Sequence, residues 1–272
     1  MSNKFKQVGW SLIDISAAAQ QRVESSLLSF GVRSESIDIS NMVTGYQAFK
    51  SLSEYDSEYK SYPGSLEHCF LEKSLEHYLS LLLINPKSGM TGVDIGSCQS
   101  VMASLGRRIY GVRYFEQDLD YPAGVHGDRI GSSADAIPLP DESVDFMTLH
   151  CTFEHFENNA DTGFVKECAR LLKKGGRAVI LPLYMCEVFC NITGETDADT
   201  HAEIGFDSTA DHYCIIPEWQ NRFGRHYSPE AFLERVWQPA KISGLNPILY
   251  KIDNWAAIHK DLWLRWALVI ER

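Results

Sequence analysis

Residues Thr91–Ser100 read TGVDIGSCQS, and this stretch decides the fold class of the chain. Its pattern predicts a short buried strand over Gly92–Ile95, a tight turn at Gly96 and a helix that starts near Gln99. Gly96 lets the backbone bend and approach a ligand closely, and the free N–H groups at the start of the helix can bind that ligand. A strand, an acid and a turn glycine in this order are typical of a nucleotide-binding turn. On these ten residues alone, an ordinary strand-to-helix turn is an equal alternative.

Composition narrows the class of protein. The chain has 272 residues, of which 44% are hydrophobic, so it can bury a sizeable core. Its net charge is −11, from 36 acids and 25 bases, which argues against nucleic acid or an anionic membrane as the main partner. The seven cysteines include no C-x-x-C pair, a pattern that favours a reducing cytoplasm. The N-terminus shows no signal peptide, and the apolar run Leu79–Ile84 is far too short to span a membrane.

The first part of the chain is expected to be an accessory region. Ile15–Phe30 has apolar residues at helical spacing, whereas Ser34–Tyr62 is polar and predicts loops with short helical pieces. Ser65 is the expected N-cap of the next helix, and Asn85 followed by proline ends it. The predicted units are an N-terminal helical region (1–64), a main domain (65–272) and an insertion within it (185–227).

Strands and helices alternate from residue 92 onward. Further strands are expected at Ile109–Phe115, Val144–His150 and Arg177–Tyr184. Between the last two strands, Thr162–Lys174 has its apolar residues on one helical face. The run KKGG at 173–176 is expected to end this helix with cations near its negative pole and a glycine stop. This alternation predicts a parallel sheet with helices on both faces.

The end of the chain continues the alternation after a long interruption. Ser228, followed by proline, is the expected N-cap of another helix. Two closing strands are expected at Pro247–Ile252 and Leu264–Ile270. Before them, residues 185–227 are long, polar and irregular in pattern, which is typical of a functional or mobile segment.

Three further segments follow the turn in a fixed order. Glu116, in YFEQD, lies about 20 residues after Gly96. SADAIPLPDESVDFM covers Ser133–Met147, and HCTFEHF leads through a helix into LLKKGGRAVI. Together with VDIGSCQS, these segments resemble the class I S-adenosylmethionine-dependent methyltransferases over roughly residues 65–184. The resemblance implies S-adenosylmethionine as cofactor and an α/β, Rossmann-like sheet flanked by helices, with an N-terminal helical extension and a polar insertion after strand five.

The resemblance also implies cofactor-binding residues near the strand ends. Asp135 matches the acid that reads the adenine amino group, with Ala134 beside it. Glu116 matches the acid that binds the two ribose hydroxyls, and Asp118 is the alternative. The full predicted cofactor-binding set is Asp94, Gly96, Ser97, Glu116, Ala134, Asp135 and His150.

Methyl transfer to an alcohol needs a base, because a neutral hydroxyl is a poor nucleophile, and histidine is the usual base near neutral pH. His155, in CTFEHF, follows strand four at the mouth of the expected pocket. Tyr184, at the end of strand five, and His201, in the insertion, are further catalytic candidates. A structural role for His155 is the alternative, with His212 or His226 as the base instead.

The insertion carries several groups that could bind a ligand, among them His201, Glu203, Asp207, Asp211 and His212. These residues form no compact metal-binding motif, so an acceptor lid is favoured over a metal site. Trp219 and Arg225 could hold a sugar face or a phosphate.

The sequence therefore predicts a cytoplasmic methyltransferase that acts on a small-molecule acceptor, without nucleic-acid or membrane partners. The expected reaction is O-methylation of a sugar, a nucleotide-sugar or another precursor of surface polysaccharide. A nicotinamide-dependent oxidoreductase is a rival, but it would need a fuller G-x-G-x-x-G turn. Because Cys98 and Ser100 stand where the family has two more glycines, a cofactor-binding protein without catalysis is the second rival.

Overall fold

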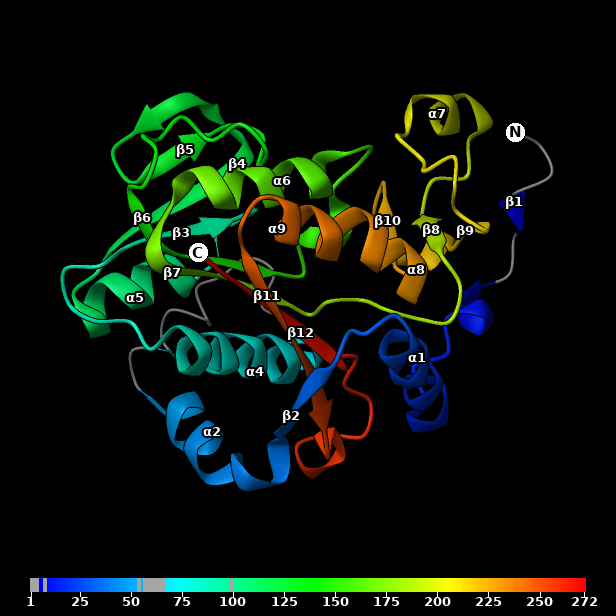
Figure 1. Ribbon diagram of the computed structural model, residues 1–272, viewed down its shortest axis with the longest axis horizontal. Helices are drawn as coiled ribbons and strands as arrows, with labels where there is room; N and C mark the ends of the chain where they lie inside the picture. Colours follow the sequence, from blue (N-terminus) through cyan, green and yellow to red (C-terminus); the bar gives the residue numbers. More distant parts are fainter. Residues whose placement is uncertain (1–4, 7–8, 53–54, 56–66, 98–99) are drawn as a thin grey trace.

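β3 (Thr91–Ile95) lies inside a mostly parallel sheet that runs through the middle of the molecule (Figure 1). The computed structural model describes residues 5–6, 9–52, 55, 67–97 and 100–272. Within these ranges, the strands of this central sheet are, from one edge to the other, β2 (Ser34–Asp38), β11 (Asn246–Asp253), β12 (Trp266–Glu271), β7 (Leu172–Leu181), β6 (Val144–His150), β3, β4 (Arg113–His126) and β5 (Arg129–Gly131).

The middle strands are apolar because helices cover both of their faces. Val93 and Ile95 of β3 are buried, and β3 pairs in parallel with β4 on one side and with β6 on the other. β12 runs antiparallel to both of its neighbours, β7 and β11. The carboxyl ends of β3, β4 and β6 therefore meet along one edge of the sheet, which is where open α/β sheets bind their ligands.

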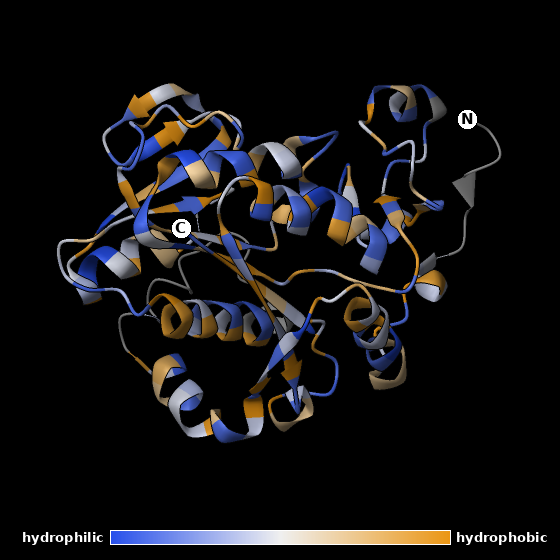
Figure 2. Ribbon diagram, in the orientation of Figure 1, coloured by the Kyte–Doolittle hydropathy of each residue, from blue (hydrophilic) through white to orange (hydrophobic). Residues whose placement is uncertain are grey.

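Helices cover both faces of the sheet, as the alternation predicts. α4 and α5 pack on one face, and α6 and α9 pack on the other (Figure 1). Figure 2 shows bands of hydrophobic and hydrophilic residues along the helices, as expected where only one side is buried. The α-helices are α1 (Ala17–Ser29), α2 (Val43–Lys50), α4 (Glu67–Ile84), α5 (Met102–Tyr110), α6 (Ala160–Leu171), α7 (Ala198–Glu203), α8 (Pro229–Phe232) and α9 (Gln238–Ile242).

Short helical turns join several of these elements. They are η1 (Gly9–Leu12), η2 (Ile39–Asn41), η3 (Phe153–His155), η4 (Pro217–Trp219), η6 (Trp255–Ala257) and the π-helical η5 (Leu233–Trp237), which links α8 to α9. Among the helices of the described ranges, none has both the length and the apolar composition needed to cross a bilayer.

Two helix ends confirm predicted signals. α8 begins after Ser228, whose Oγ accepts a hydrogen bond from the first turn at 3.2 Å; Ser16, which the sequence analysis does not single out, caps α1 in the same way at 3.3 Å. α4 ends at Ile84, and Asn85 leaves the helix with a φ of 51°. The expected N-cap of α4, Ser65, lies outside the described residues.

The region before residue 64 contributes a strand to the central sheet. Residues 34–38, predicted to be a loop, form β2, which pairs in parallel with β11 at the sheet edge. That prediction is wrong because SESID contains only one buried residue, Ile37, so the strand is specified by its neighbour rather than by its own pattern. Tyr46 and Phe49 of α2 complete the core on this side. The boundary between residues 64 and 65 stays a prediction.

The predicted strand Ile109–Phe115 is wrong in its first half. α5 continues through Tyr110 and ends at Gly111, which has a φ of 64° and is left-handed, as a helix-ending glycine commonly is. β4 begins only at Arg113 and extends well beyond the predicted end. α5 also starts later than predicted, at Met102, and residues 98 and 99 lie outside the described part of the chain.

The predicted helix Thr162–Lys174 is displaced toward the N-terminus. α6 ends at Leu171, and the lysines and glycines expected at its end form the start of β7. Lys173 Nζ lies 2.7 Å from Asp145 Oδ2 on β6, so pairing between strands holds this segment. β7 ends at Leu181, earlier than predicted.

The insertion at 185–227 is wrongly predicted to be irregular, because it builds a small sheet with the N-terminus. In the described residues, its order is β1 (Phe5–Lys6), β9 (His212–Ile215), β8 (Cys190–Thr193) and β10 (Gly224–His226). Cys190, Ile192, Cys214 and Ile216 pack together in a small apolar core of its own. Strands this short show little alternation in the sequence, which explains why the pattern is missed.

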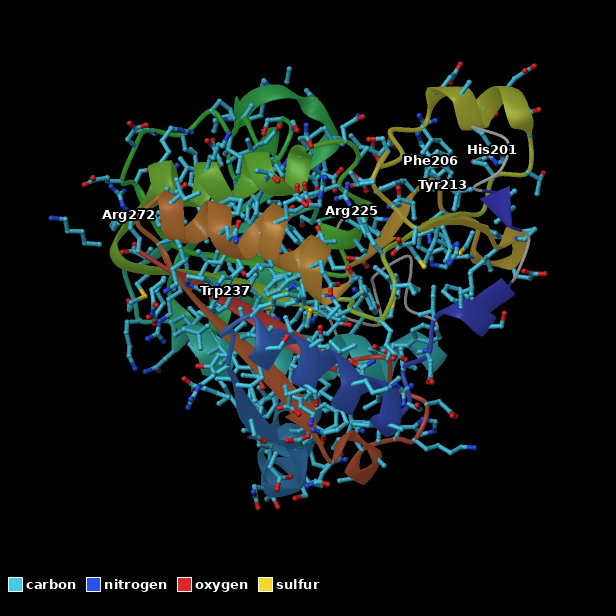
Figure 3. All side chains as sticks on the ribbon, turned by 45° about the vertical axis from the view of Figure 1, so that its right-hand side comes forward. His201, Phe206, Tyr213, Arg225, Trp237 and Arg272 are labelled. Atoms are coloured by element: carbon cyan, nitrogen blue, oxygen red, sulfur yellow. The ribbon has the colours of Figure 1, made fainter. Side chains whose placement is uncertain are left out.

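Four charged side chains, three of them buried and Arg235 partly buried, join the insertion to the main domain, and we call them the charge network. Arg225 Nε lies 2.7 Å from Asp207 Oδ2, and Arg225 Nη1 lies 3.2 Å from Asp161 Oδ2. Arg235 approaches the same two carboxylates at 2.8 and 3.2 Å. Figure 3 shows Arg225 inside the molecule, where the insertion meets the helices of the main domain. Two positive and two negative charges therefore balance one another away from water.

The same guanidinium groups also hold the loop that follows η3. Arg225 donates hydrogen bonds to the carbonyl oxygens of Phe156 at 2.7 Å and Asn158 at 2.9 Å. Arg235 donates to the same Asn158 oxygen at 2.5 Å. Asn158 has a φ of 54°, in the left-handed region that asparagine enters more readily than most residues other than glycine. The charge network thus holds the carbonyl of this left-handed residue in place.

Replacement of Arg225 by methionine should lower the free energy of unfolding by about 3–5 kcal/mol, because it leaves two buried carboxylates with a single cation. Urea denaturation followed by circular dichroism measures this loss. Arg222→Met is the matched control, because Arg222 pairs with Glu157 at 2.8 Å while 45% of its side chain is exposed. The control should lose only about 0–1 kcal/mol. Equal losses in the two variants would show that burial of the network does not matter.

Candidate functional site

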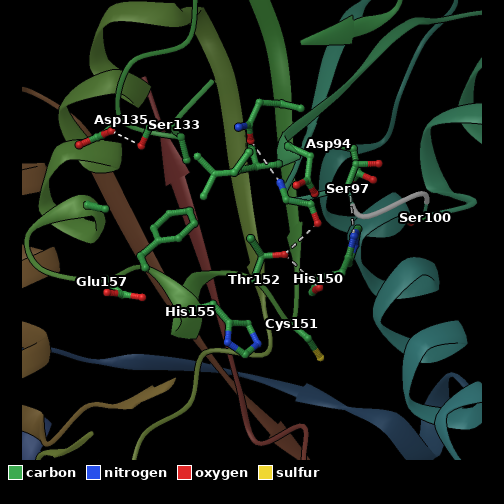
Figure 4. A pocket seen from close by; sticks show the side chains of 18 of the residues that line it. Asp94, Ser97, Ser100, Ser133, Asp135, His150, Cys151, Thr152, His155 and Glu157 are labelled. Atoms are coloured by element: carbon green, nitrogen blue, oxygen red, sulfur yellow. Dashed lines mark hydrogen bonds and ion pairs between the residues drawn. The ribbon is translucent and has the colours of Figure 1, made fainter. Parts of the chain in front are cut away.

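A cavity of about 900 Å³ opens at the carboxyl ends of β3, β4 and β6. Its wall also includes residues of α4, of the loop before α6 and of the insertion, and Figure 4 shows many of them. This volume is typical of a site for a small molecule or a cofactor. The predicted site residues on the wall are Asp94, Gly96, Ser97, Ala134, Asp135, His150 and His155.

Gly96 forms the turn that follows β3. Its φ of 59° is left-handed, and a Cβ at this position would approach the Thr152 side chain to 2.3 Å. The Gly96 N–H donates to Gln117 Oε1 at 3.2 Å, and the Ser97 N–H donates to the Gln117 carbonyl oxygen at 2.9 Å. The turn is therefore packed against the ends of both neighbouring strands, and a larger residue at 96 would displace Thr152 on the cavity wall.

Three buried polar atoms at this end of the cavity have no hydrogen-bond partner among the described residues. They are Asp94 Oδ2, Ser97 Oγ and His150 Nδ1. The other carboxylate oxygen of Asp94, Oδ1, accepts a hydrogen bond from Thr148 Oγ1 at 2.7 Å. Because buried polar groups are nearly always hydrogen-bonded, this end of the cavity suits a ligand that carries both donors and acceptors. The ammonium and carboxylate of an α-amino acid are such a pair.

Asp118, and not Glu116, is the acid of β4 that lines the cavity. The Glu116 carboxylate lies 2.6 Å from Arg107 Nη2 and 3.5 Å from Arg129 Nε, in ion pairs away from the cavity. The last residue of β3, Ile95, is paired with Gln117 on β4, so the first residue beyond the paired strand ends is Asp118. The predicted strand ends at Phe115, two residues before the last residue of β4 that pairs with β3. The predicted ribose-binding acid, Glu116, likewise lies two residues before Asp118, which lines the cavity.

Asp135 lies across the cavity from Asp94 (Figure 4), and its neighbour in the chain, Ala134, also lines the cavity. Ser133 Oγ donates a hydrogen bond to Asp135 Oδ1 at 2.5 Å. α6 packs directly against this loop, since a Cβ on Gly163 would come within 2.7 Å of the Asp135 Cβ. A carboxylate beside buried Ala134 offers one acceptor next to an apolar wall, which suits the amino group of a flat heterocycle.

His155 reaches the cavity from η3 and is held by the insertion. Its Nδ1 lies 2.6 Å from the carbonyl oxygen of Phe223, which accepts a hydrogen bond only if Nδ1 carries a proton. The ring stacks on Trp219, with centroids 5.5 Å apart and planes 15° apart. In the neutral ring, Nε2 therefore keeps its lone pair, and it lies 3.7 Å from Glu154 Oε1. This tautomer can accept a proton from a ligand.

The other two predicted catalytic residues are not among the residues that line the cavity. The Tyr184 hydroxyl lies 3.8 Å from Cys151 Sγ, and burial raises the pKa of Tyr184 well above its ordinary value. His201 lies on α7, where its Nε2 is 2.7 Å from the carbonyl oxygen of Glu195, and Figure 3 shows it in the outer part of the insertion. The structure thus brings only His155 of the three onto the wall.

The wall also includes residues that the sequence does not single out. Lys73 of α4 donates hydrogen bonds to the His150 carbonyl oxygen at 3.1 Å and to Glu76 Oε2 at 3.2 Å. Cys151 has a φ of 48°, and burial raises the pKa of its thiol well above the ordinary value. Cys151 and Thr152 belong to the HCTFEHF segment, so this motif could have indicated that they lie near the site. Lys73 precedes all of the matching motifs, and nothing in its local sequence indicates that it lines the cavity.

The acids and histidines of the insertion serve other purposes in the structure. Asp207 belongs to the charge network, and Asp211 Oδ2 accepts a hydrogen bond from the Phe189 N–H at 2.9 Å. In the ranges that the structure describes, no group of three or more His, Cys, Asp or Glu residues is arranged to hold a metal ion.

Fold, turn and cavity together define an α/β protein that binds a nucleotide-like cofactor at its strand ends. Residues 91–180 match the family described as a methyltransferase domain. The chain therefore carries a methyltransferase domain at these residues, in a Rossmann-like sheet, and S-adenosylmethionine is the cofactor of such a domain. The matched residues run from β3 into β7 and contain most of the cavity wall, and the match sets aside the nicotinamide-dependent alternative. No curated protein sequence matches the chain.

Solved structures similar to this one are remote in sequence. A 1,6-didemethyltoxoflavin-N1-methyltransferase from Burkholderia thailandensis, with 1,6-didemethyltoxoflavin and S-adenosylhomocysteine bound, is 12% identical, with 96% of this chain and 92% of that chain covered and a TM-score of 0.46. The YcgJ protein from Bacillus subtilis is 16% identical, with 64% and 70% covered and a TM-score of 0.40. A phosphoethanolamine N-methyltransferase 2 from Haemonchus contortus is 16% identical, with 75% and 45% covered and a TM-score of 0.39.

The position of Asp118 on the wall leads to a prediction about cofactor binding. Asp118→Ala should weaken the binding of S-adenosylhomocysteine by about tenfold to a hundredfold, because a charged hydrogen-bond acceptor is worth about 1.5–3 kcal/mol. Asp135→Ala should have an effect of similar size. Glu116→Ala is the matched control and should change the dissociation constant much less. Isothermal titration calorimetry measures all three, and a loss confined to the Glu116 variant would return the ribose to Glu116.

Proposed function

We propose that the protein transfers the methyl group of S-adenosylmethionine to a hydroxyl group of a small polar acceptor, such as a sugar, a nucleotide-sugar or another polysaccharide precursor. The observation that carries this proposal is the His155 ring, which lies on the cavity wall with Nδ1 committed to the Phe223 carbonyl, so that Nε2 keeps its lone pair in the neutral ring. A neutral hydroxyl needs such a base to become a nucleophile, whereas a carboxylate or phosphate oxygen does not. A positioned imidazole therefore favours an alcohol as the acceptor.

The residues of the wall suit S-adenosylmethionine along its length. Asp135 would accept a hydrogen bond from the adenine amino group, and Asp118 would accept hydrogen bonds from the ribose hydroxyls. Asp94 Oδ2 and Ser97 Oγ, which lack partners among the described residues, would bind the amino-acid end. The backbone at Gly96 leaves room for close approach, since a Cβ there would already meet Thr152. When bound, the cofactor supplies a methyl group on a positively charged sulfur, so the protein need not form a covalent intermediate.

The chain's own residues then have to align the acceptor, exclude water and remove one proton. His155 Nε2 takes the proton of the acceptor hydroxyl as that oxygen becomes the nucleophile. The resulting imidazolium is stabilised on both sides, because Nδ1 donates to the Phe223 carbonyl and Glu154 Oε1 lies 3.7 Å from Nε2. Glu154 is 6% exposed, so its charge is poorly screened by solvent.

Acceptor recognition belongs, in this proposal, to the insertion at 185–227. Asn221 of the insertion lines the cavity, and Trp219 and the Phe223 carbonyl hold the base. An acceptor that reaches Nε2 therefore contacts the insertion as well as the main domain. The charge network anchors this segment, so it acts as a fixed wall of the acceptor site more than as a free lid.

Removal of the proposed base should reduce turnover and leave cofactor binding intact. His155→Ala should lower the rate of methyl transfer by about 10²–10⁴, the usual effect of losing a general base, while S-adenosylhomocysteine binds as before. The assay follows labelled methyl from S-adenosylmethionine into a panel of sugars and nucleotide-sugars. His201→Ala is the matched control, because this histidine of the insertion also bonds to a carbonyl but is not among the residues that line the cavity.

The pH dependence gives a second readout for the same role. Only neutral imidazole accepts a proton, so the wild-type rate should rise with pH. The rise should be absent in His155→Ala. A modest loss of rate with an unchanged pH profile would contradict the role of His155 and would indicate an acceptor that is already an anion.

A further inference from the structure

His150 links α4 to the cofactor turn through buried polar atoms. Its Nε2 lies 2.8 Å from Ser80 Oγ on α4, and its Nδ1 lies 3.5 Å from Asp94 Oδ1 on β3. Ser80, Asp94 and His150 are all buried, so water does not compete for these contacts. Figure 4 shows the His150 ring close to Asp94 and Ser97.

The surroundings decide which ring nitrogen of His150 carries the proton. Burial lowers the pKa of His150, although Asp94 opposes the shift, so the ring is neutral near pH 7. A lone pair on Nδ1 would face the Asp94 carboxylate and be repelled by it, so the proton sits on Nδ1. Nε2 is then the acceptor, and the Ser80 hydroxyl donates to it. Ser80 thereby holds the ring in the orientation in which Nδ1–H points toward Asp94.

Two further residues of α4 hold His150 in place. Lys73 Nζ donates to the His150 carbonyl oxygen at 3.1 Å. The His77 ring packs edge-on against the His150 ring, with centroids 4.6 Å apart and planes at 80°, and burial lowers the pKa of His77 well below its ordinary value, which keeps that ring neutral as well. α4 therefore controls both the backbone and the ring of His150, although α4 lies outside the matched family segment at 91–180.

We infer that His150 is a positioning residue for the amino-acid end of the cofactor, and that Ser80 of α4 sets its orientation. Nδ1–H presents a donor beside the unpartnered Asp94 Oδ2, so the two side chains together match the carboxylate and ammonium of an α-amino acid. The order Ser80, His150, Asp94 is that of a hydrolase triad, but Ser80 is fully buried and cannot reach a substrate. This inference rests on the placement of the cofactor proposed above.

Two ligands separate a positioning role from a structural one. S-Adenosylhomocysteine has the amino-acid end, and 5′-methylthioadenosine shares its adenosine and sulfur but lacks that end. His150→Gln removes the donor at Nδ1 and should weaken S-adenosylhomocysteine by about tenfold, while 5′-methylthioadenosine keeps its affinity. His150→Asn places an amide N–H near the position of Nδ1 and should restore most of the loss. Calorimetric titration of the full-length protein measures each dissociation constant.

Ser80→Ala tests the contribution of α4. Loss of the hydroxyl removes the hydrogen bond that orients the His150 ring, so the affinity for S-adenosylhomocysteine should fall by a few-fold without any change for 5′-methylthioadenosine. Ser74→Ala is the matched control, because Ser74 is another buried serine of α4 but bonds to the Tyr46 hydroxyl at 2.8 Å, away from the cavity. It should leave both affinities unchanged.

The outcomes are distinct. Equal weakening of both ligands in the His150 variants would show a structural role and overturn the inference, as would unchanged S-adenosylhomocysteine affinity in His150→Gln. An asparagine variant no better than the glutamine variant would remove the donor role of Nδ1. Failure of the wild-type protein to bind either ligand would instead refute the proposed cofactor site itself.

Discussion

The geometry of the site depends on the buried pairing of Arg225 and Arg235 with Asp161 and Asp207. Asp207 and Arg225 come from the insertion, and Asp161 and Arg235 come from helices of the main domain. Each part contributes one cation and one anion, and the cross pairs of Arg225 with Asp161 and of Arg235 with Asp207 join the two parts. Because the arginines also bind backbone carbonyls of the loop after η3, the same pairing that docks the insertion shapes one wall of the cavity.

Local signals predicted those parts of the fold that local chemistry decides. The serine cap at Ser228 and the breaking pair at Asn85 mark helix ends, and the apolar run VDFMTLH marks β6 correctly to the residue. β2 escaped prediction because most of its residues are exposed and its conformation comes from pairing with β11. The lysines at the start of β7 were assigned to a helix end for a similar reason. Lys173 pairs with a carboxylate on the neighbouring strand, a contact that the local pattern does not reveal. Contacts between distant segments leave no periodic trace in a single sequence.

The residues of the site also fall into those that local sequence could indicate and those that only tertiary contacts reveal. Residues close to the turn and to β6 could be found from motifs, and the structure brings Asp94, Gly96, Asp135 and His155 to one cavity. The choice between Glu116 and Asp118 depends on where β4 ends relative to β3, and the structure places Asp118, the alternative acid, on the cavity wall. Ser80 and Lys73 lie on a helix before the motifs and reach the site only through tertiary packing, so the sequence offers no spacing from which to infer them.

The hydrogen bond from His155 Nδ1 to the Phe223 carbonyl has a consequence for how such an enzyme can change its substrate. The segment proposed to recognise the acceptor also supplies the oxygen that fixes the tautomer of the proposed base. Replacing the insertion as a cassette would alter selectivity and proton transfer in one event, whereas substitution of single side chains such as Asn221 would leave the backbone oxygen in place. We therefore expect enzymes of this architecture to change acceptor by single substitutions that keep the backbone of the insertion. Exchange of the whole insertion would also have to restore the hydrogen bond that orients the proposed base.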